Sequence, residues 1–320
     1  MGNPRETASS RLSRRDTIKS LALAGLGQAL TAPARAQTPI AIQHHVTIGE
    51  LEVTVLSDGH MLQATSIFGT DRTDAERAAA WKTAGVTAES VRAAVNVTLV
   101  KRGSEFTLID VGAGPNFMAT TGKLTDSLAA AGIDPKAITA VIFTHGHPDH
   151  LWGAVDEFDD SPRFPNARYL ISEAEWALWM TGDPTAKLPA DRQNFIPGAK
   201  RNLGFLKDRM TLIKPNAAIA PGIAAIDTAG HTQGHIAVAL SSGNASAIVL
   251  ADALIHPHIS FVHPAWKLAA DHEPDRAAVT RQALLDRLAA GKTPIIAYHL
   301  PFPGLGHVEK RGLAYAFAAT

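Results

Sequence analysis

From residue 46 onward, apolar and polar positions alternate in short runs that predict β-hairpins. Residues 46–48 and 51–56 flank the turn Gly49-Glu50, and their period of two places the apolar side chains on one face of a sheet. Residues 95–100 and 105–109 flank a second turn in the same way. The first part of the chain is therefore predicted to be a hairpin-built sheet.

Segments of helical composition separate and follow these hairpins. Residues 71–92 are predicted to be helical, with Asp71 or Thr73 as the N-cap, and residues 123–131 to be a crossover helix. Hairpins followed by a crossover predict a mixed sheet with helices on its faces. A similar order in the second half hints at an internal duplication, with predicted elements at 140–143, 168–172, 173–180, 223–227, 236–240, 247–250, 274–290 and 294–297.

Residues 181–204 interrupt this pattern. They are rich in Pro, Gly and Asn but keep Phe195, so they predict a long irregular insertion rather than a linker. No boundary is predicted between residues 37 and 320, which are expected to form a single domain.

Residues 1–36 are predicted to be an export signal. The pair Arg14-Arg15, the weakly apolar residues 21–30 and the small-x-small motif Ala34-Arg35-Ala36 resemble a twin-arginine signal peptide. The apolar run is shorter than the ~20 residues needed to cross a bilayer, so no permanent membrane anchor is expected. We expect a mature protein that starts near Gln37 and is periplasmic or secreted.

Composition narrows the chemistry. The 30 basic residues balance the 30 acidic ones, so neither nucleic acid nor an acidic membrane surface is an expected partner. The sequence has no cysteine, which excludes disulfides, thiolate nucleophiles and cysteine-containing zinc sites. Any metal must be held by nitrogen and oxygen, and the chain has 14 histidines to supply them.

The strongest chemical signal is Thr144-His145-Gly146-His147-Pro148-Asp149-His150, which directly follows the predicted buried strand 140–143. An extended backbone aims His145 and His147 to the same side, and Pro148 bends the chain so that Asp149 and His150 follow beneath them. Four side chains of ligand type in six positions predict a site for zinc or a first-row neighbour.

Three more candidate ligands occupy the same kind of position. His231, Asp252 and His299 each come just after a short apolar strand. Strand ends in a layered sheet protein face a common crevice, so we expect these residues to converge with the cluster at 145–150.

The series of seven residues resembles the two-metal pattern of the metallo-β-lactamase superfamily, and the match spans the whole predicted mature chain. The resemblance implies an α/β fold, an αββα sandwich of two mixed β-sheets flanked by helices. It also implies that His145, His147 and His231 hold one metal ion, that Asp149, His150 and His299 hold a second, and that Asp252 bridges the two.

The same resemblance implies two divalent ions, zinc first and manganese, cobalt or iron as alternatives, with a bridging hydroxide as the nucleophile. Asp252 and Asp149 are the predicted catalytic residues, Asp149 as a proton shuttle to the leaving oxygen. We therefore expect a binuclear-metal-dependent hydrolase.

Within the superfamily, the chain looks most like methyl parathion hydrolase and its lactone- or arylester-cleaving relatives. The likeness rests on Ser57-Asp58-Gly59, on residues 144–151 and on residues 299–307. It implies lactones or aryl esters as substrates, organophosphate triesters as the alternative, and a homodimer. A glyoxalase II-type thioesterase would want basic residues for an anionic carrier, and a non-catalytic binding module would be expected to have lost ligands, so both rank lower.

Five aromatic residues near the predicted ligands are candidates for a substrate pocket. Any one of them can be ordinary core, but as a group they favour a small neutral substrate with an apolar or aromatic body. They are Phe117, Trp152, Trp176, Trp179 and Phe195.

Other polar residues carry two open interpretations. Asp58 and Asp110 follow strands and can either orient a ligand histidine or form a turn. His60 and His235 are expected to be structural or to orient ligands rather than to bind the metal. His256, His258 and His263 follow Asp252 and can line the mouth of the pocket, but the neighbouring Pro257 and Pro264 favour an exposed loop.

Overall fold

The structure is a computed structural model that describes Met1 and residues 43–320. The chain divides into two units, Met1–Pro39 and Ile40–Thr320, and the described fold belongs to the second. Apart from Met1, the predicted signal peptide lies outside the described residues, as does the predicted domain start at residue 37.

Two seven-stranded mixed sheets form the centre of the fold. The first has the order β1-β2-β3-β4-β5-β6-β7, in which β4 to β7 are parallel, and the second has the order β14-β13-β12-β11-β10-β9-β8, in which only β11 and β12 are parallel. The strands are β1 (Gln43–Ile48), β2 (Leu51–Ala64), β3 (Ser90–Arg102), β4 (Glu105–Ile109), β5 (Ala140–Ile142), β6 (Arg168–Ser172), β7 (Met210–Ile213), β8 (Ala218–Ala220), β9 (Ile223–Asp227), β10 (Ile236–Ser242), β11 (Ala245–Val249), β12 (Ile295–Ile296), β13 (Leu305–Arg311) and β14 (Ala314–Ala319).

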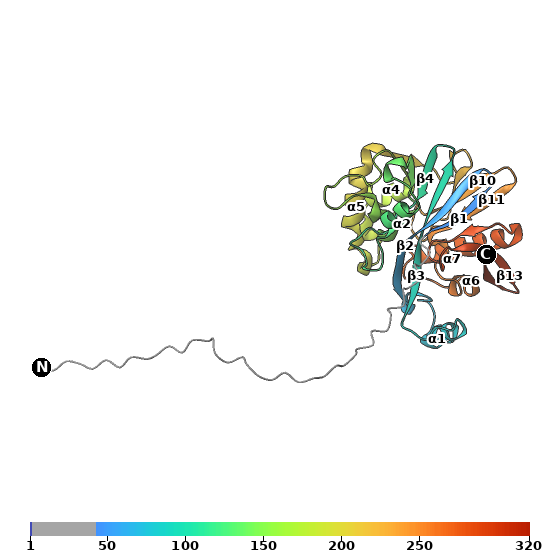
Figure 1. Cartoon of the computed structure of the whole chain (residues 1–320). Coiled ribbons are helices and arrows are strands. Elements are labelled where there is room, and N and C mark those ends of the chain that lie inside the picture. Colours follow the sequence, from blue (N-terminus) through green and yellow to red (C-terminus); the bar gives the residue numbers. More distant parts are fainter. Residues whose placement is uncertain (2–42) are drawn as a thin grey trace, which may run out of the picture. The chain divides into compact units, whose positions relative to one another are not determined.

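Helices cover the outer faces, with α2, α4 and α5 on the side of the first sheet and α6 and α7 on the side of the second (Figure 1). This arrangement confirms the predicted αββα sandwich. The α-helices are α1 (Asp74–Thr83), α2 (Leu124–Ala130), α3 (Pro148–Leu151), α4 (Glu173–Trp176), α5 (Phe195–Leu206), α6 (Ile259–Val262) and α7 (Pro274–Gly291).

Strand periodicity divides the apolar side chains between the layers. Leu99 of β3 packs toward the helices of the first sheet, whereas the next residue, Val100, packs between the two sheets. Val141 and Ile142 of β5 divide in the same way. Because successive strand residues point to opposite faces, one short apolar run supplies two cores.

The hairpin of β2 and β3 is longer than predicted. The register of the pair shifts between Ser57 and His60, and β2 then continues to Ala64 beside the start of β3. This extension past the end of β1 forms an arm that carries α1 at its tip (Figure 1). The prediction ended the strand at Leu56 because the bulge interrupts the alternation.

The prediction of one helix over residues 71–92 was wrong in its extent. A capping box between Thr73 and Glu76 starts α1, and the helix ends at Thr83, before Gly85 at a φ of +70°. Residues 90–92 belong to β3 instead.

The predicted irregular insertion at 181–204 contains short turns but ends in a regular helix, α5. Pro197 stands in its first turn, where its missing N–H is not needed, so the residue that suggested a loop is compatible with the helix.

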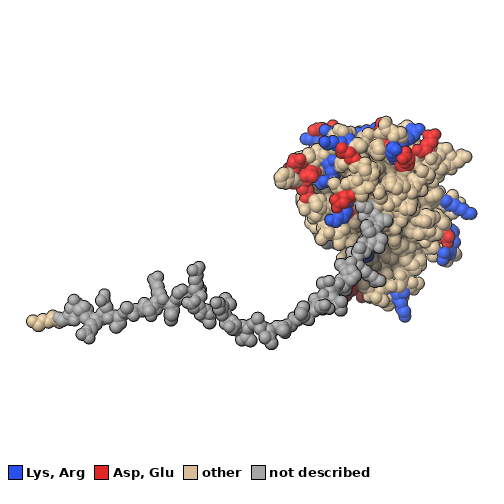
Figure 2. All heavy atoms as spheres, in the orientation of Figure 1, with Lys and Arg blue, Asp and Glu red and all other residues tan. Residues whose placement is uncertain are grey.

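Basic and acidic side chains lie interspersed on the face of the molecule that Figure 2 shows. Among the described residues, no helix combines the length and the apolar character needed to cross a membrane.

Candidate metal centre

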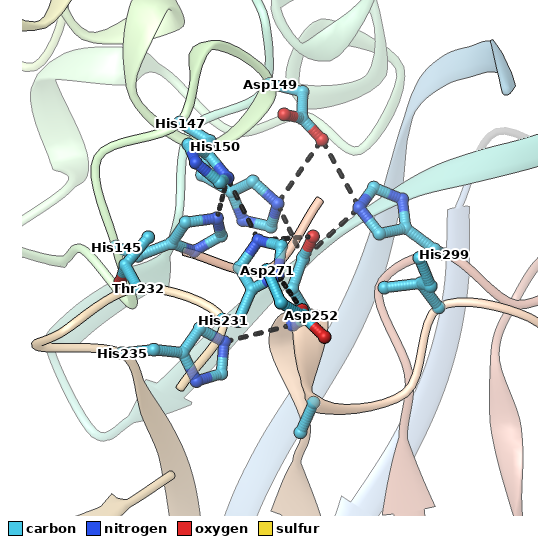
Figure 3. A network of polar contacts seen from close by, with 12 residues as sticks. His145, His147, Asp149, His150, His231, Thr232, His235, Asp252, Asp271 and His299 are labelled. Atoms are coloured by element: carbon cyan, nitrogen blue, oxygen red, sulfur yellow. Dashed lines mark hydrogen bonds and ion pairs between the residues drawn. The ribbon is translucent and has the colours of Figure 1, made fainter. Parts of the chain in front are cut away.

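All seven predicted ligands lie at the ends of strands and converge on one buried centre (Figure 3). His145 and His147 follow β5, and Pro148 then opens α3, whose first turn carries Asp149 and His150. The second sheet supplies the other three, because His231 follows β9, Asp252 follows β11 and His299 follows β12. Each of the seven side chains is buried.

Three histidines form the first half of the centre. Nδ1 of His147 lies 3.0 Å from Nε2 of His145 and 2.9 Å from Nε2 of His231. Their ligand atoms all lie within 4.8 Å of one another. This is the spacing at which three imidazoles can share one ion.

The second half is built from Asp149, His150 and His299, with Asp252 beside both halves. Nε2 of His150 lies 3.3 Å from Oδ2 of Asp149 and 2.9 Å from Oδ1 of Asp252. The same two oxygens lie 3.3 and 3.2 Å from Nε2 of His299. On the other side, Oδ2 of Asp252 lies 3.3 Å from Nε2 of His231.

The atoms of the second half fit a bound cation. Oδ2 of Asp149, Oδ1 of Asp252, and Nε2 of His150 and of His299 are buried and have no hydrogen-bond partner. Buried polar atoms are normally hydrogen-bonded, so four ligand atoms that lie close to one another without a hydrogen bond form a donor set that a divalent ion would satisfy.

The electrostatics of the two halves differ. Burial, together with the His231 and His272 imidazoles, lowers the pKa of His147 well below its usual range, which favours the neutral form that binds metals. Burial acts in the same direction on His299, but Asp252 and Asp149 outweigh it and raise the pKa of His299 to about 10. The carboxylates thus concentrate negative charge where the second ion would be held.

Asp110 orients two of the ligands. Its Oδ2 lies 2.8 Å from Nδ1 of His150 and accepts the hydroxyl of Thr144 at 2.7 Å. That hydroxyl lies 3.1 Å from Nδ1 of His145. Of the two interpretations left open for Asp110, the orienting role is therefore the one that the contacts support.

Asp58 takes the other interpretation. Its carboxylate accepts hydrogen bonds from the backbone N–H groups of Ala113, Gly122 and Leu124 at 2.9, 3.1 and 2.8 Å. Burial raises the pKa of this carboxyl to about 6, against the lowering effect of those hydrogen bonds. Asp58 holds the loop after β4 in place and does not contact a ligand histidine.

The five other histidines singled out in the sequence lie outside the groups of side chains that could hold a metal ion. Nε2 of His235 accepts the backbone N–H of Asp252 at 3.1 Å, and Nδ1 of His60 lies 3.2 Å from Arg92. The prediction of exposure was wrong for His256, which is buried and accepts the backbone N–H of Ile259 at the start of α6. His258 and His263 are partly buried.

Several residues around the ligands were not predicted. Asp271 lies 2.9 Å from Nδ1 of His231, and Nε2 of His272 lies 3.0 Å from Nε2 of His147. The hydroxyl of Tyr298 donates to the backbone carbonyl of Asp149 at 2.8 Å. In the sequence, only its position next to the predicted ligand His299 indicated that Tyr298 lies near the centre. Two further buried residues complete the surroundings, Glu175 and Arg281.

A cavity of about 220 Å³ opens beside the ligands His147, Asp149, His231 and Asp252. Its wall is largely apolar and comes from the β2 arm, from the loop after β4, from the start of α5 and from the region before α7. The wall residues are Met61, Leu62, Gln63, Ala64, Ile67, Phe117, Met118, Pro148, Arg192, Phe195, Ile255 and Ala270.

The five predicted pocket aromatics divide around this cavity. Phe117 and Phe195 line it, and Trp152 packs edge-on against both of them from behind. Trp179 is fully buried in the core, and Trp176 is partly buried against the same core. These three tryptophans lie outside the residues that line the cavity.

Comparison with known proteins places the chain in a family. The sequence profile described as Metallo-beta-lactamase superfamily matches residues 91–299, more than half of the chain. The chain belongs to the metallo-beta-lactamase superfamily. A search of curated protein sequences found no match.

Several solved structures share the fold. AidC, a dizinc quorum-quenching lactonase seen with the product N-hexanoyl-L-homoserine, is 28% identical, with a TM-score of 0.81 over 87% of this chain and 97% of AidC. Hydrolase AbOPH is also 28% identical, with a TM-score of 0.82 over 88% of this chain and 99% of its own. A probable metal-dependent hydrolase from Staphylococcus aureus, 19% identical with a TM-score of 0.68, covers 86% of this chain and 99% of its own and shares the fold.

Proposed function

We propose that this protein is a metal-dependent hydrolase that binds two divalent ions, zinc first, and cleaves small neutral lactones or aryl esters. The observation that carries the proposal is the pair of buried ligand sets beside a largely apolar cavity. The 28% identity to AidC supports the lactone class. When bound, the two ions would polarise the ester carbonyl and make a water nucleophilic at neutral pH.

In this proposal His145, His147 and His231 hold one ion, Asp149, His150 and His299 hold the other, and Asp252 contacts both. Metal binding needs neutral imidazoles and ionised carboxylates, so the second ion would displace the proton that Asp252 and Asp149 stabilise on His299. Asp110 and Asp271 fix the orientation of His150 and His231 through the nitrogen that faces away from the ion.

We further propose that Asp149 moves a proton. Asp149 lines the cavity, where a proton released by the attacking water could pass through its carboxylate to the leaving oxygen. The imidazoles of His150 and His299 outweigh burial and hold the pKa of Asp149 well below its usual range, so the carboxylate is ionised and would keep such a proton only in passing. Full turnover by an Asp149→Asn variant with both ions bound would rule this role out.

The apolar wall selects the substrate. Phe117, Phe195 and Met118 present no charge, so they favour the acyl or aryl part of a neutral ester and exclude water from the reacting carbonyl. The alternative substrate is an organophosphate triester, which the resemblance of residues 299–307 to methyl parathion hydrolase favours.

A kinetic panel tests the function. The zinc-loaded protein is assayed on dihydrocoumarin, homoserine lactones, aryl acetates and a paraoxon-type triester, beside a His231→Ala variant. We expect the highest kcat/KM on a lactone or aryl ester, and little activity in the variant. Preference for the triester would replace the lactone proposal by its alternative. No turnover of any substrate after loading with zinc, manganese or cobalt would refute the enzyme itself.

Export and dimerisation are further proposals that rest on sequence resemblance. Residues 1–36 are proposed to direct twin-arginine export, which an Arg14→Lys, Arg15→Lys double variant should block in a fractionation experiment. The proposed homodimer predicts about twice the mass of one chain in light scattering of the purified protein.

A further inference from the structure

The first half of the centre depends on two loops that belong to different sheets. His145 and His147 follow β5 of the first sheet, whereas His231 lies between β9 and β10 of the second. Each imidazole nitrogen that binds zinc lies about 2.0–2.1 Å from the ion. The separation of the two loops therefore decides whether all three imidazoles can reach one ion.

One buried carboxylate, that of Glu175 on α4, connects both loops. Its Oε1 accepts the backbone N–H of Gly146, between the two histidines of the first loop, at 2.8 Å. Its Oε2 accepts the hydroxyl of Thr232 at 2.6 Å and the backbone N–H of Gly234 at 3.2 Å, both in the second loop. Glu175 has no exposed surface.

The carboxylate is saturated with donors. Oε1 also accepts the indole N–H of Trp179 at 2.6 Å, so each oxygen receives two hydrogen bonds. Hydrogen bonds to a charged acceptor are about twice as strong as neutral ones, and burial strengthens them further. Ser172 adds a second tie, because its hydroxyl donates to the carbonyl of Gly234 at 2.6 Å.

The two loop glycines are the residues that this contact requires. A Cβ on Gly146 would lie 2.3 Å from Nε1 of Trp179, and a Cβ on Gly234 would lie 2.1 Å from the backbone nitrogen of Glu175. Both contacts are far inside van der Waals distance. Glycine thus lets each loop come within hydrogen-bond reach of the same carboxylate.

We propose that Glu175 is a positioning residue for the three-histidine half of the centre. It holds the loops at 144–147 and 231–235 at the separation at which His145, His147 and His231 share one ion. Within the two loops its hydrogen-bond donors are Gly146, Thr232 and Gly234 rather than the ligand imidazoles, so it acts through the loops. This inference rests on the proposed two-metal function.

A Glu175→Gln variant tests the role. The amide has nearly the same shape, but its NH₂ group would face two donors in place of an acceptor oxygen. Zinc affinity is measured by competition with a chelator, and occupancy at each position by anomalous diffraction from crystals of the loaded protein. We expect affinity at the three-histidine position to fall 10- to 100-fold, the range for residues that orient ligands. The position held by Asp149, His150 and His299 should keep its affinity within about twofold.

Matched variants separate positioning from general damage. Glu173→Gln changes an exposed carboxylate on the same helix and should leave both affinities unchanged. If Glu175→Gln does not fold, Thr232→Val removes one donor to Oε2 and should give about a tenfold loss at the three-histidine position. Thr232→Ser keeps the hydroxyl and should restore the affinity.

The outcomes distinguish the two proposals. A wild-type protein that binds no metal would refute the proposed function. A wild-type protein with two ions, and a Glu175→Gln variant that keeps both affinities or loses both by the same factor, would overturn the positioning role alone.

Discussion

Asp271 and Arg281 form a buried ion pair directly behind the metal centre. Nη2 of Arg281 lies 2.9 Å from Oδ2 of Asp271, whose other oxygen lies 2.9 Å from Nδ1 of His231. The guanidinium also donates to the backbone carbonyls of Pro264 and Trp266 at 2.9 Å each. One arginine of α7 therefore fixes the carboxylate that orients a ligand.

Replacing this arginine should destabilise the protein strongly. An Arg281→Met change leaves Asp271 charged, buried and unpaired on one side, so we expect the free energy of unfolding to fall by about 3–5 kcal/mol. Urea denaturation of the zinc-loaded protein measures it. Arg287→Met, at an exposed position of the same helix, should stay within about 0.5 kcal/mol of wild type. A loss below about 1 kcal/mol for Arg281→Met would contradict the buried pair's role.

Asp58 should give the stability a distinct pH dependence. Burial raises the pKa of Asp58 to about 6 from an ordinary 3.8, so the folded protein binds this proton more tightly than the unfolded chain does. Its contribution is fully present below about pH 4 and is lost as the pH rises through about 6. Relative to Asp58→Asn, which cannot titrate, the wild-type free energy of unfolding should fall by about 2.4 kcal/mol between pH 4 and pH 7.

Urea denaturation at several pH values, with chelator present in every sample, measures that difference. The chelator removes any contribution from pH-dependent metal binding, and the subtraction of the two proteins cancels the other titrating groups. Parallel stability curves for wild type and Asp58→Asn would show that the pKa of Asp58 is not raised.

Metal removal should abolish hydrolysis and lower the stability. An ion present at about 100 times its Kd adds about 2.7 kcal/mol to the free energy of unfolding, so chelation should lower the thermal midpoint and zinc should restore it. A His145→Ala variant, which lacks one ligand of the three-histidine half, should show a smaller response to the chelator. Equal midpoints for the wild type with and without chelator would argue against resident ions.

Leu62 should affect substrate use without affecting the fold. Its side chain lines the cavity but remains 54% exposed, so Leu62→Ala removes substrate contact and little core packing. We expect kcat/KM for esters with long acyl groups to fall roughly fivefold, which corresponds to a loss of about 1 kcal/mol of transition-state stabilisation. The thermal midpoint should stay unchanged. Leu313→Ala, at a fully exposed turn, is the control. Equal kinetics for the two variants would remove Leu62 from the substrate wall.

The sequence predicted the part of the centre that depends on local geometry. His145 to His150 follow one buried strand, and the same strand-end position identified His231, Asp252 and His299. The same strands predicted a mixed sheet with helices on its faces, whereas the αββα sandwich and the division of the seven ligands between two ions came from the resemblance to the metallo-β-lactamase superfamily. Residue type and strand-end position were sufficient for the candidate ligands alone.

The surroundings of the ligands depend on contacts between distant parts of the chain. Glu175 meets Gly146 across 29 positions and Thr232 across 57, and Asp271 meets His231 across 40. A glutamate in a short helix or an aspartate before a helix has no local pattern that distinguishes these roles. Likewise, the bulge in β2 and the proline in α5 interrupt the sequence patterns of a strand and of a helix, although the strand continues past the bulge and the helix includes the proline.

Part of the cavity wall lies on the arm at the end of β2, apart from the loops that carry the metal ligands. Residues 61–64 line the cavity beyond the point where β2 stops pairing with β1, whereas the ligands are fixed at strand ends of both sheets. Substitutions on the arm can therefore alter the substrate range and leave the metal ligands in place. This hydrolase fold is accordingly a scaffold on which new substrate specificities could be selected by randomising the four positions 61–64.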